Sequence, residues 1–151
     1  MRAPGVHLFH SPEKIVQRAL LLASIHRKDL ISAAGPDGLA AMVSLCRAGY
    51  ERVECARQAT CVGADEQSDF LLILGRMTAS DLADVIRRTA RLLRDGGVLI
   101  IQVTGAGDEA AIRPALAAAG LEAPFTLVDR SVGRLVMHRV KRAAGLVRKA
   151  S

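Results

Sequence analysis

Three short, predominantly apolar runs constrain the fold of this 151-residue chain more than any other feature. They cover residues 30–34, 70–74 and 98–103, and each has the length of a strand rather than of a helix. A strand that is apolar at successive positions has to be covered on both faces, as in a parallel sheet between layers of helices. We therefore expect the three runs to lie side by side in one buried sheet.

Segments with helical spacing of apolar residues alternate with these runs. A helix is predicted over residues 12–27, because Ser11 can cap its first amides and cations fill its last turn. Apolar stripes over residues 39–46, 82–93 and 112–119 predict three more helices. We expect Ser80 to cap the middle one, Pro114 to kink the start of the last, and Gly49 and Gly120 to end the first and last.

The remaining segments complete an α/β pattern. A strand is predicted at residues 52–56, a turn at 95–97 and a terminal antiparallel pair at 125–128 and 134–140. The polar stretch 57–68 is too short to hold a helix between two strands and has space only for a brief strand at 60–62. Because strands and helices alternate, crossover connections and a mostly parallel sheet are predicted.

Composition restricts the functional classes. The formal net charge is +6, but the arginines are spread along the chain, with four on one predicted helix and further basic residues in the tail 141–151, and aromatic residues make up only 3% of the chain. A solvated face and a basic tail therefore explain the charge better than a nucleic-acid surface does, although such a partner stays open. No apolar run reaches the length of a membrane span, and no signal-peptide pattern is present, so we expect a soluble protein without a membrane partner.

Cysteines and histidines give no metal site by their spacing. Cys46, Cys55 and Cys61 are odd in number and have no short paired spacing, which argues against disulfides and zinc and favours a reduced, cytoplasmic setting. His7 and His10 lack a partner acid or cysteine at a supporting spacing, so we predict no metal.

The order of several motifs resembles the class I S-adenosylmethionine-dependent methyltransferases. RLLRDGGVLII at residues 91–101 is similar to the helix, Gly-Gly turn and strand of that family, and it follows the apolar strand FLLIL at 70–74. LISAAGPDG at residues 30–38 resembles the family's first strand and glycine loop. The resemblance covers residues 29–140. It implies a single Rossmann-like domain, residues 1–151, with helices on both faces of a mostly parallel sheet and a C-terminal antiparallel hairpin.

The resemblance also implies a cofactor lying across the carboxyl ends of the strands. The candidate cofactor-binding residues are Gly35 and Gly38, whose backbone would approach the methionine part, Asp37 between them, and Asp65 on the adenine side. Two acids of the family pattern are absent. Residues 32–34 are Ser-Ala-Ala where the first strand normally ends in an acid, and the second strand ends in Cys-Ala, which leaves Glu54 displaced.

The missing acids indicate a methyltransferase-like domain in which S-adenosylmethionine binding is lost or weakened. It would act as a non-catalytic or interaction protein, with a small-molecule ligand or a homodimer partner. Two alternatives stay open: an active small-molecule methyltransferase that keeps the cofactor, and a dinucleotide-binding Rossmann domain. The second rests on Ala33, Gly35 and Gly38, which approximate the glycine fingerprint for NAD.

Overall fold

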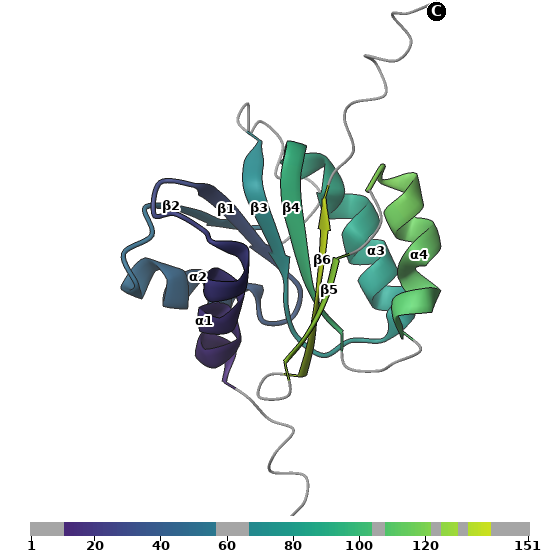
Figure 1. The fold of residues 1–151 in the computed structure, drawn as a ribbon, viewed down its shortest axis with the longest axis horizontal. Coiled ribbons are helices and arrows are strands. Elements are labelled where there is room, and N and C mark those ends of the chain that lie inside the picture. The colour runs from purple at the N-terminus through teal and green to yellow at the C-terminus, as the bar shows by residue number, and fades with distance from the viewer. Residues whose placement is uncertain (1–10, 57–66, 104–107, 122–124, 130–132, 140–151) are drawn as a thin grey trace, which may run out of the picture.

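A computed structural model describes residues 11–56, 67–103, 108–121, 125–129 and 133–139. Its centre is one six-stranded sheet (Figure 1) with the order β2-β1-β3-β4-β6-β5. The strands are β1 (Leu30–Ala34), β2 (Arg52–Cys55), β3 (Ser68–Ile73), β4 (Leu93–Val103), β5 (Phe125–Asp129) and β6 (Gly133–Arg139). The three apolar runs thus become the adjacent strands β1, β3 and β4, as predicted.

The first four strands in this order are parallel to their neighbours. Ile31 of β1 lies opposite Val53 of β2 and Phe70 of β3, and Phe70 lies opposite Val98 of β4. β6 pairs antiparallel with β4, and β5 pairs antiparallel with β6. Because the parallel strands all run in one direction, their carboxyl ends share one edge of the sheet.

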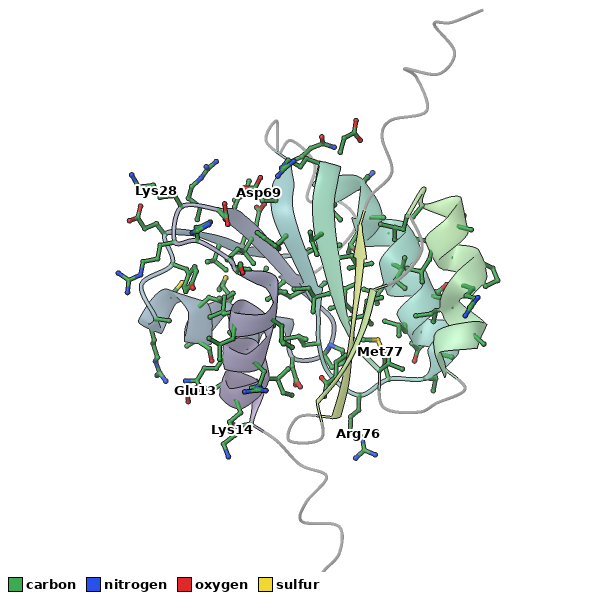
Figure 2. The ribbon with its side chains drawn as sticks, viewed as in Figure 1. Glu13, Lys14, Lys28, Asp69, Arg76 and Met77 are labelled. Carbon is green, nitrogen blue, oxygen red and sulfur yellow. The ribbon has the colours of Figure 1, made fainter. Side chains whose placement is uncertain are left out.

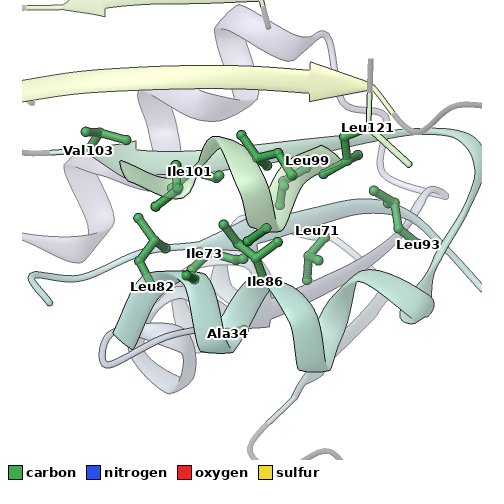
Figure 3. Close-up of a cluster of buried hydrophobic side chains, with 14 residues drawn as sticks. Ala34, Leu71, Ile73, Leu82, Ile86, Leu93, Leu99, Ile101, Val103 and Leu121 are labelled. Carbon is green, nitrogen blue, oxygen red and sulfur yellow. The ribbon is translucent and has the colours of Figure 1, made fainter. Parts of the chain in front are cut away.

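Helices cover both faces of the sheet, which confirms the three-layer α/β prediction. α1 (Pro12–Ala23) and α2 (Gly38–Arg47) pack on one face, and α3 (Ala79–Thr89) and α4 (Asp108–Ala118) pack on the other (Figure 1). The buried side chains therefore form two clusters. Figure 3 shows the one beneath α3 and α4, where Leu71, Ile73 and Ile101 of the sheet meet Leu82 and Ile86 of α3.

α1 ends at Ala23 rather than at residue 27. Ser24 adopts a left-handed conformation with φ of 54°, which ends the helix, and the Ile25 N–H donates to the Leu20 carbonyl. The His26 N–H then donates to the Asp29 carboxylate at 2.8 Å, so residues 26–29 form a separate turn. The predicted cations of the last turn lie beyond the helix for this reason.

α3 begins two residues earlier than the predicted cap implies. Thr78, not Ser80, is the N-cap, because its extended backbone lets Oγ1 accept the Asp81 N–H at 3.1 Å. Ser80 lies inside the helix. At the other end a 3₁₀ turn follows at Ala90–Leu92, and Leu93, which the apolar stripe assigned to the helix, already belongs to β4.

The predicted turn at residues 95–97 lies inside β4 as an irregularity. Ser68 of β3 pairs with Leu93 and Phe70 pairs with Val98, so β4 carries extra residues at this point. Gly96 takes a φ of +82°, which lets the extra residues bend out without ending the strand.

Three further predictions concern the ends of helices. Gly49 and Gly120 have positive φ after α2 and α4, as predicted. Pro114 lies in the interior of α4 rather than at its beginning.

Several sequence predictions fall on residues outside the described part of the chain, namely His7, His10, Cys61, Asp65, the brief strand at 60–62 and the tail 141–151. None of the helices in the described part of the chain has the length and apolar character of a membrane span.

Candidate ligand site at the strand ends

A cavity of about 520 Å³ opens where β1 and β2 end. One side of it is formed by Gly35 and Pro36 of the loop after β1, Leu39 of α2, Cys55 of β2, and Ala56, which follows β2. The other side consists of residues on or just before α3, namely Met77, Asp81, Val85, Arg88 and Thr89. Open α/β sheets generally bind their ligands at this edge, and the volume lies within the range of small-molecule sites.

The topology explains why the space exists. In the described residues only α3 and α4 lie on this face of the sheet, and they pack against each other and over β3 and β4. β2 is at the edge of the sheet, beyond β1. The flank of α3 that faces β1 and β2 is therefore left uncovered by any described helix, and this flank forms the cavity wall.

Gly35 is fixed by packing on the neighbouring strand. Its φ is +90°, and a Cβ atom added there would lie 2.5 Å from the Leu74 carbonyl oxygen and 3.2 Å from Met77 Cε. The side of Gly35 on which a side chain would stand is thus already occupied by protein atoms. The sequence predicts that the Gly35 backbone approaches the methionine part of a cofactor, and the structure shows that this glycine also packs against Leu74 at the border of the cavity.

Gly75, which follows β3, fits against the same loop from the opposite side. Its φ is +118°, and an added Cβ atom would lie 2.9 Å from Pro36 Cδ. The Asp37 N–H donates to the Leu74 carbonyl at 3.1 Å, and the Gly75 N–H donates to Gln102 Oε1 at 2.9 Å. The loops after β1 and β3 are therefore held together by backbone contacts that only glycine permits.

Gly38 lies in the first turn of α2 against the end of β1. An added Cβ atom would be 3.3 Å from the Ala33 carbonyl carbon and oxygen and 3.6 Å from Cys55 Sγ. Its small size lets the helix approach the strand closely. Of the predicted cofactor residues, Gly35 lines the cavity, Gly38 and Asp37 lie beside it in the α2 start, and Asp65 is outside the described residues. Their assignment to a cofactor stays a prediction.

Glu54 does not reach the cavity wall. It lies opposite Ser32 in the parallel register, and its Oε2 accepts a hydrogen bond from Ser32 Oγ at 3.4 Å. Ser32 Oγ also bonds to Ser68 Oγ, and both serines are buried. The carboxylate nearest to the end of β2 is thus turned toward buried hydroxyls, while Cys55 and Ala56 occupy the cavity edge.

Two charged side chains of α3 line the cavity, and sequence reasoning did not single them out. Asp81 is in the first turn and Arg88 is two turns later, about 10 Å along the axis at 1.5 Å per residue. The negative charge of Asp81 is favourable near the helix N-terminus, and the positive charge of Arg88 is favourable near the C-terminus, because of the helix dipole. The sequence placed the arginines of α3 on a solvated face, and it gave no signal that the flank carrying Arg88 borders a cavity.

Asp69 is a hydrogen-bonded acid that lies at the edge of the sheet opposite the cavity. Figure 2 shows it far from Met77, which lines the cavity. Asp69 accepts hydrogen bonds from the Leu30 N–H at 2.9 Å and from Arg94 Nε at 2.5 Å. Burial raises the pKa of this carboxyl, but these two bonds and the charges of Arg94 and Arg52 outweigh it, so the pKa is lowered below 3.8. Asp69 therefore joins strand ends and is not part of the cavity.

Metal chemistry has no support in the described residues, which contain no cluster of three or more His, Cys, Asp or Glu side chains arranged to hold an ion. Cys46 and Cys55 are free thiols.

No protein-family model matches the sequence, and no curated protein matches it. DesVI of Streptomyces venezuelae superposes with a TM-score of 0.62 and 9% identity, over 89% of this chain and 94% of that chain. The magnesium protoporphyrin IX methyltransferase of Synechocystis, solved with bound SAH, gives 0.59 and 13%, over 93% and 89%.

A SAM-dependent O-methyltransferase of Thermotoga maritima gives a TM-score of 0.59 at 15% identity, over 86% of this chain and 66% of that chain. The chain has the class I methyltransferase fold. Identities this low establish the fold alone, and the activity of a methyltransferase fold has to be argued from its site.

Proposed function

We propose that this chain is a non-catalytic methyltransferase-fold domain that binds a small molecule at the strand ends and has lost or weakened S-adenosylmethionine binding. One observation carries the proposal: the cavity has kept its place in the fold, while its edge lacks carboxylates at the ends of β1 and β2. Ala34 and Cys55 stand at those two ends, and Glu54 is hydrogen-bonded to Ser32.

The described residues do not fit the cofactor well. Adenosylmethionine presents a cationic methionine group and a ribose diol, which carboxylates at the two strand ends would bind. Hydrogen bonds to a charged group contribute about 1.5–3 kcal/mol each, so losing them weakens binding by about tenfold to more than a hundredfold. The Gly35 loop does not compensate for the missing carboxylates, because its packing against Leu74 leaves no additional space for the cofactor on that side.

Calorimetric titration of the intact chain with S-adenosylmethionine and its demethylated product tests the proposal. We expect no heat, or a dissociation constant in the millimolar range. A micromolar constant would overturn the proposal and support the active methyltransferase. The same titration with NAD decides the dinucleotide alternative, for which micromolar binding would be required.

A gain-of-function variant makes the test sharper. Cys55→Asp places a carboxylate at the cavity edge at the end of β2, and we expect it to strengthen adenosylmethionine binding by about tenfold. Cys55→Asn is the matched neutral control and should leave the affinity unchanged. If the two variants bind equally, the missing acid does not explain weak binding.

A further inference from the structure

We infer that the cavity binds an anionic small molecule with an apolar body, held through its charged group by Arg88. This inference rests on the proposed function, because it identifies the ligand class of the same cavity. The inferred ligand carries a negative charge, whereas adenosylmethionine would bring a positive charge to the site.

Arg88 of α3 has bonding capacity that two other arginines, Arg87 of α3 and Arg94 of β4, lack. Arg87 pairs with the Asp84 carboxylate at 3.2 Å, and Arg94 pairs with Asp69. Arg88 donates Nε to the Asp84 carbonyl at a long 3.4 Å and forms no ion pair within the described residues. Arg88 is one of the residues that line the cavity, and a guanidinium group is suited to bidentate contact with a carboxylate, sulfonate or phosphate.

Apolar side chains supply the rest of the binding surface. Leu39 is 47% exposed, more than every other large apolar residue in the described part of the chain except Leu21, and it lines the cavity together with Pro36 and Met77. Val85 lies one turn before Arg88 on the same wall. A ligand that covered Leu39 would remove this apolar area from water, which favours binding in proportion to the area.

The charges inside the cavity also fix the orientation of such a ligand. Asp81 lies at the end where α3 begins, and Arg88 lies two turns away. A negative group is repelled from the first position and attracted to the second, so the apolar body would lie toward Met77 and Leu39. The net charge of +6 assists the approach of an anion.

A pair of fluorescent probes separates the charge from the apolar contact. Anilinonaphthalene sulfonate is anionic, and N-phenyl-1-naphthylamine has the same apolar body without the sulfonate. Both are titrated into the wild-type chain, Arg88→Gln and Arg87→Gln, at a temperature well below the cooperative thermal unfolding transition of each protein, which far-UV circular dichroism records. This condition excludes probe binding to a loosened core.

We expect Arg88→Gln to weaken binding of the sulfonate about tenfold and to change binding of the neutral probe less than twofold. Arg87→Gln, which alters an arginine outside this cavity, should leave both probes unchanged. Val85→Phe narrows the cavity and should weaken both, which locates the site. High salt should reduce the effect of Arg88.

The outcomes distinguish the two proposals. If neither probe binds, the small-molecule cavity fails and the ligand class fails with it. If both bind and Val85→Phe weakens them, but Arg88→Gln affects the two probes equally or not at all, the anionic class is wrong and the cavity stands. A cationic analogue that binds more tightly than the sulfonate would instead assign the charged contact to Asp81.

Discussion

Replacing Gly35 by alanine tests the packing role of the loop after β1. The positive φ of +90° costs a residue with a side chain about 1–3 kcal/mol. The added Cβ would lie 2.5 Å from a backbone oxygen, which cannot rotate away, so the loop has to shift at a further cost of about 1–3 kcal/mol. The hydrogen bond from the Asp37 N–H to Leu74 contributes about 1 kcal/mol and would be strained as well. We therefore expect a loss of about 3–7 kcal/mol.

Gly120→Ala is the matched control. Gly120 has a similar φ of +79°, but an added Cβ atom there meets no atom within 4 Å. Only the backbone cost applies, and it should not exceed about 1–3 kcal/mol. Urea unfolding followed by far-UV circular dichroism measures both losses, and equal slopes against urea confirm that the unfolded states are comparable.

If the two variants lose the same free energy to within about 1 kcal/mol, the close contact with Leu74 has no energetic weight and the packing role of Gly35 is wrong. The comparison also bears on ligand assays. A valine at Gly35 would abolish binding by unfolding the strand edge, so its effect carries no information about a cofactor.

Two further predictions concern local contacts. Asp69→Asn should cost about 1 kcal/mol at neutral pH. Because the pKa of Asp69 is lower in the folded state, its contribution to stability is present above the unfolded value near 3.8 and is lost as the pH falls through the folded pKa. The free energy of unfolding should therefore fall less in acid for the variant than for the wild type. If the free energies of unfolding of the two proteins change in parallel between pH 7 and 2, this account of Asp69 is wrong. Thr78→Ala should cost about 1 kcal/mol through loss of the α3 cap, whereas Ser80→Ala should be neutral within about 0.5 kcal/mol; equal thermal shifts for the two would restore the cap predicted from the sequence.

The central strands could be predicted because their sequence is apolar at nearly every position. Residues 70–74 and 98–103 are apolar on both faces, and only a strand between two helical layers needs that pattern. Element ends were harder to predict, since a single backbone conformation decides them. Ser24 ends α1 in a left-handed conformation that glycine usually supplies, and Thr78 competes with Ser80 for the same cap.

The candidate site was predictable in position but not in composition. Glycines after β1 marked the edge at which the cavity lies, and the absence of acids there follows directly from the sequence. Arg88 escaped prediction because its importance depends on which flank of α3 is left uncovered, and that is decided by the packing of the whole sheet. Homodimer formation and a cytoplasmic location stay predictions.

The interlocked Gly35 and Gly75 have a consequence for how such domains change during evolution. A residue retained for two reasons survives the loss of one of them, so selection for folding alone would preserve the glycines after a lineage gave up its original chemistry. A recognisable glycine signature is therefore poor proof of present-day catalysis, whereas the strand-end carboxylates, which nothing in the scaffold requires, would disappear first and record the change.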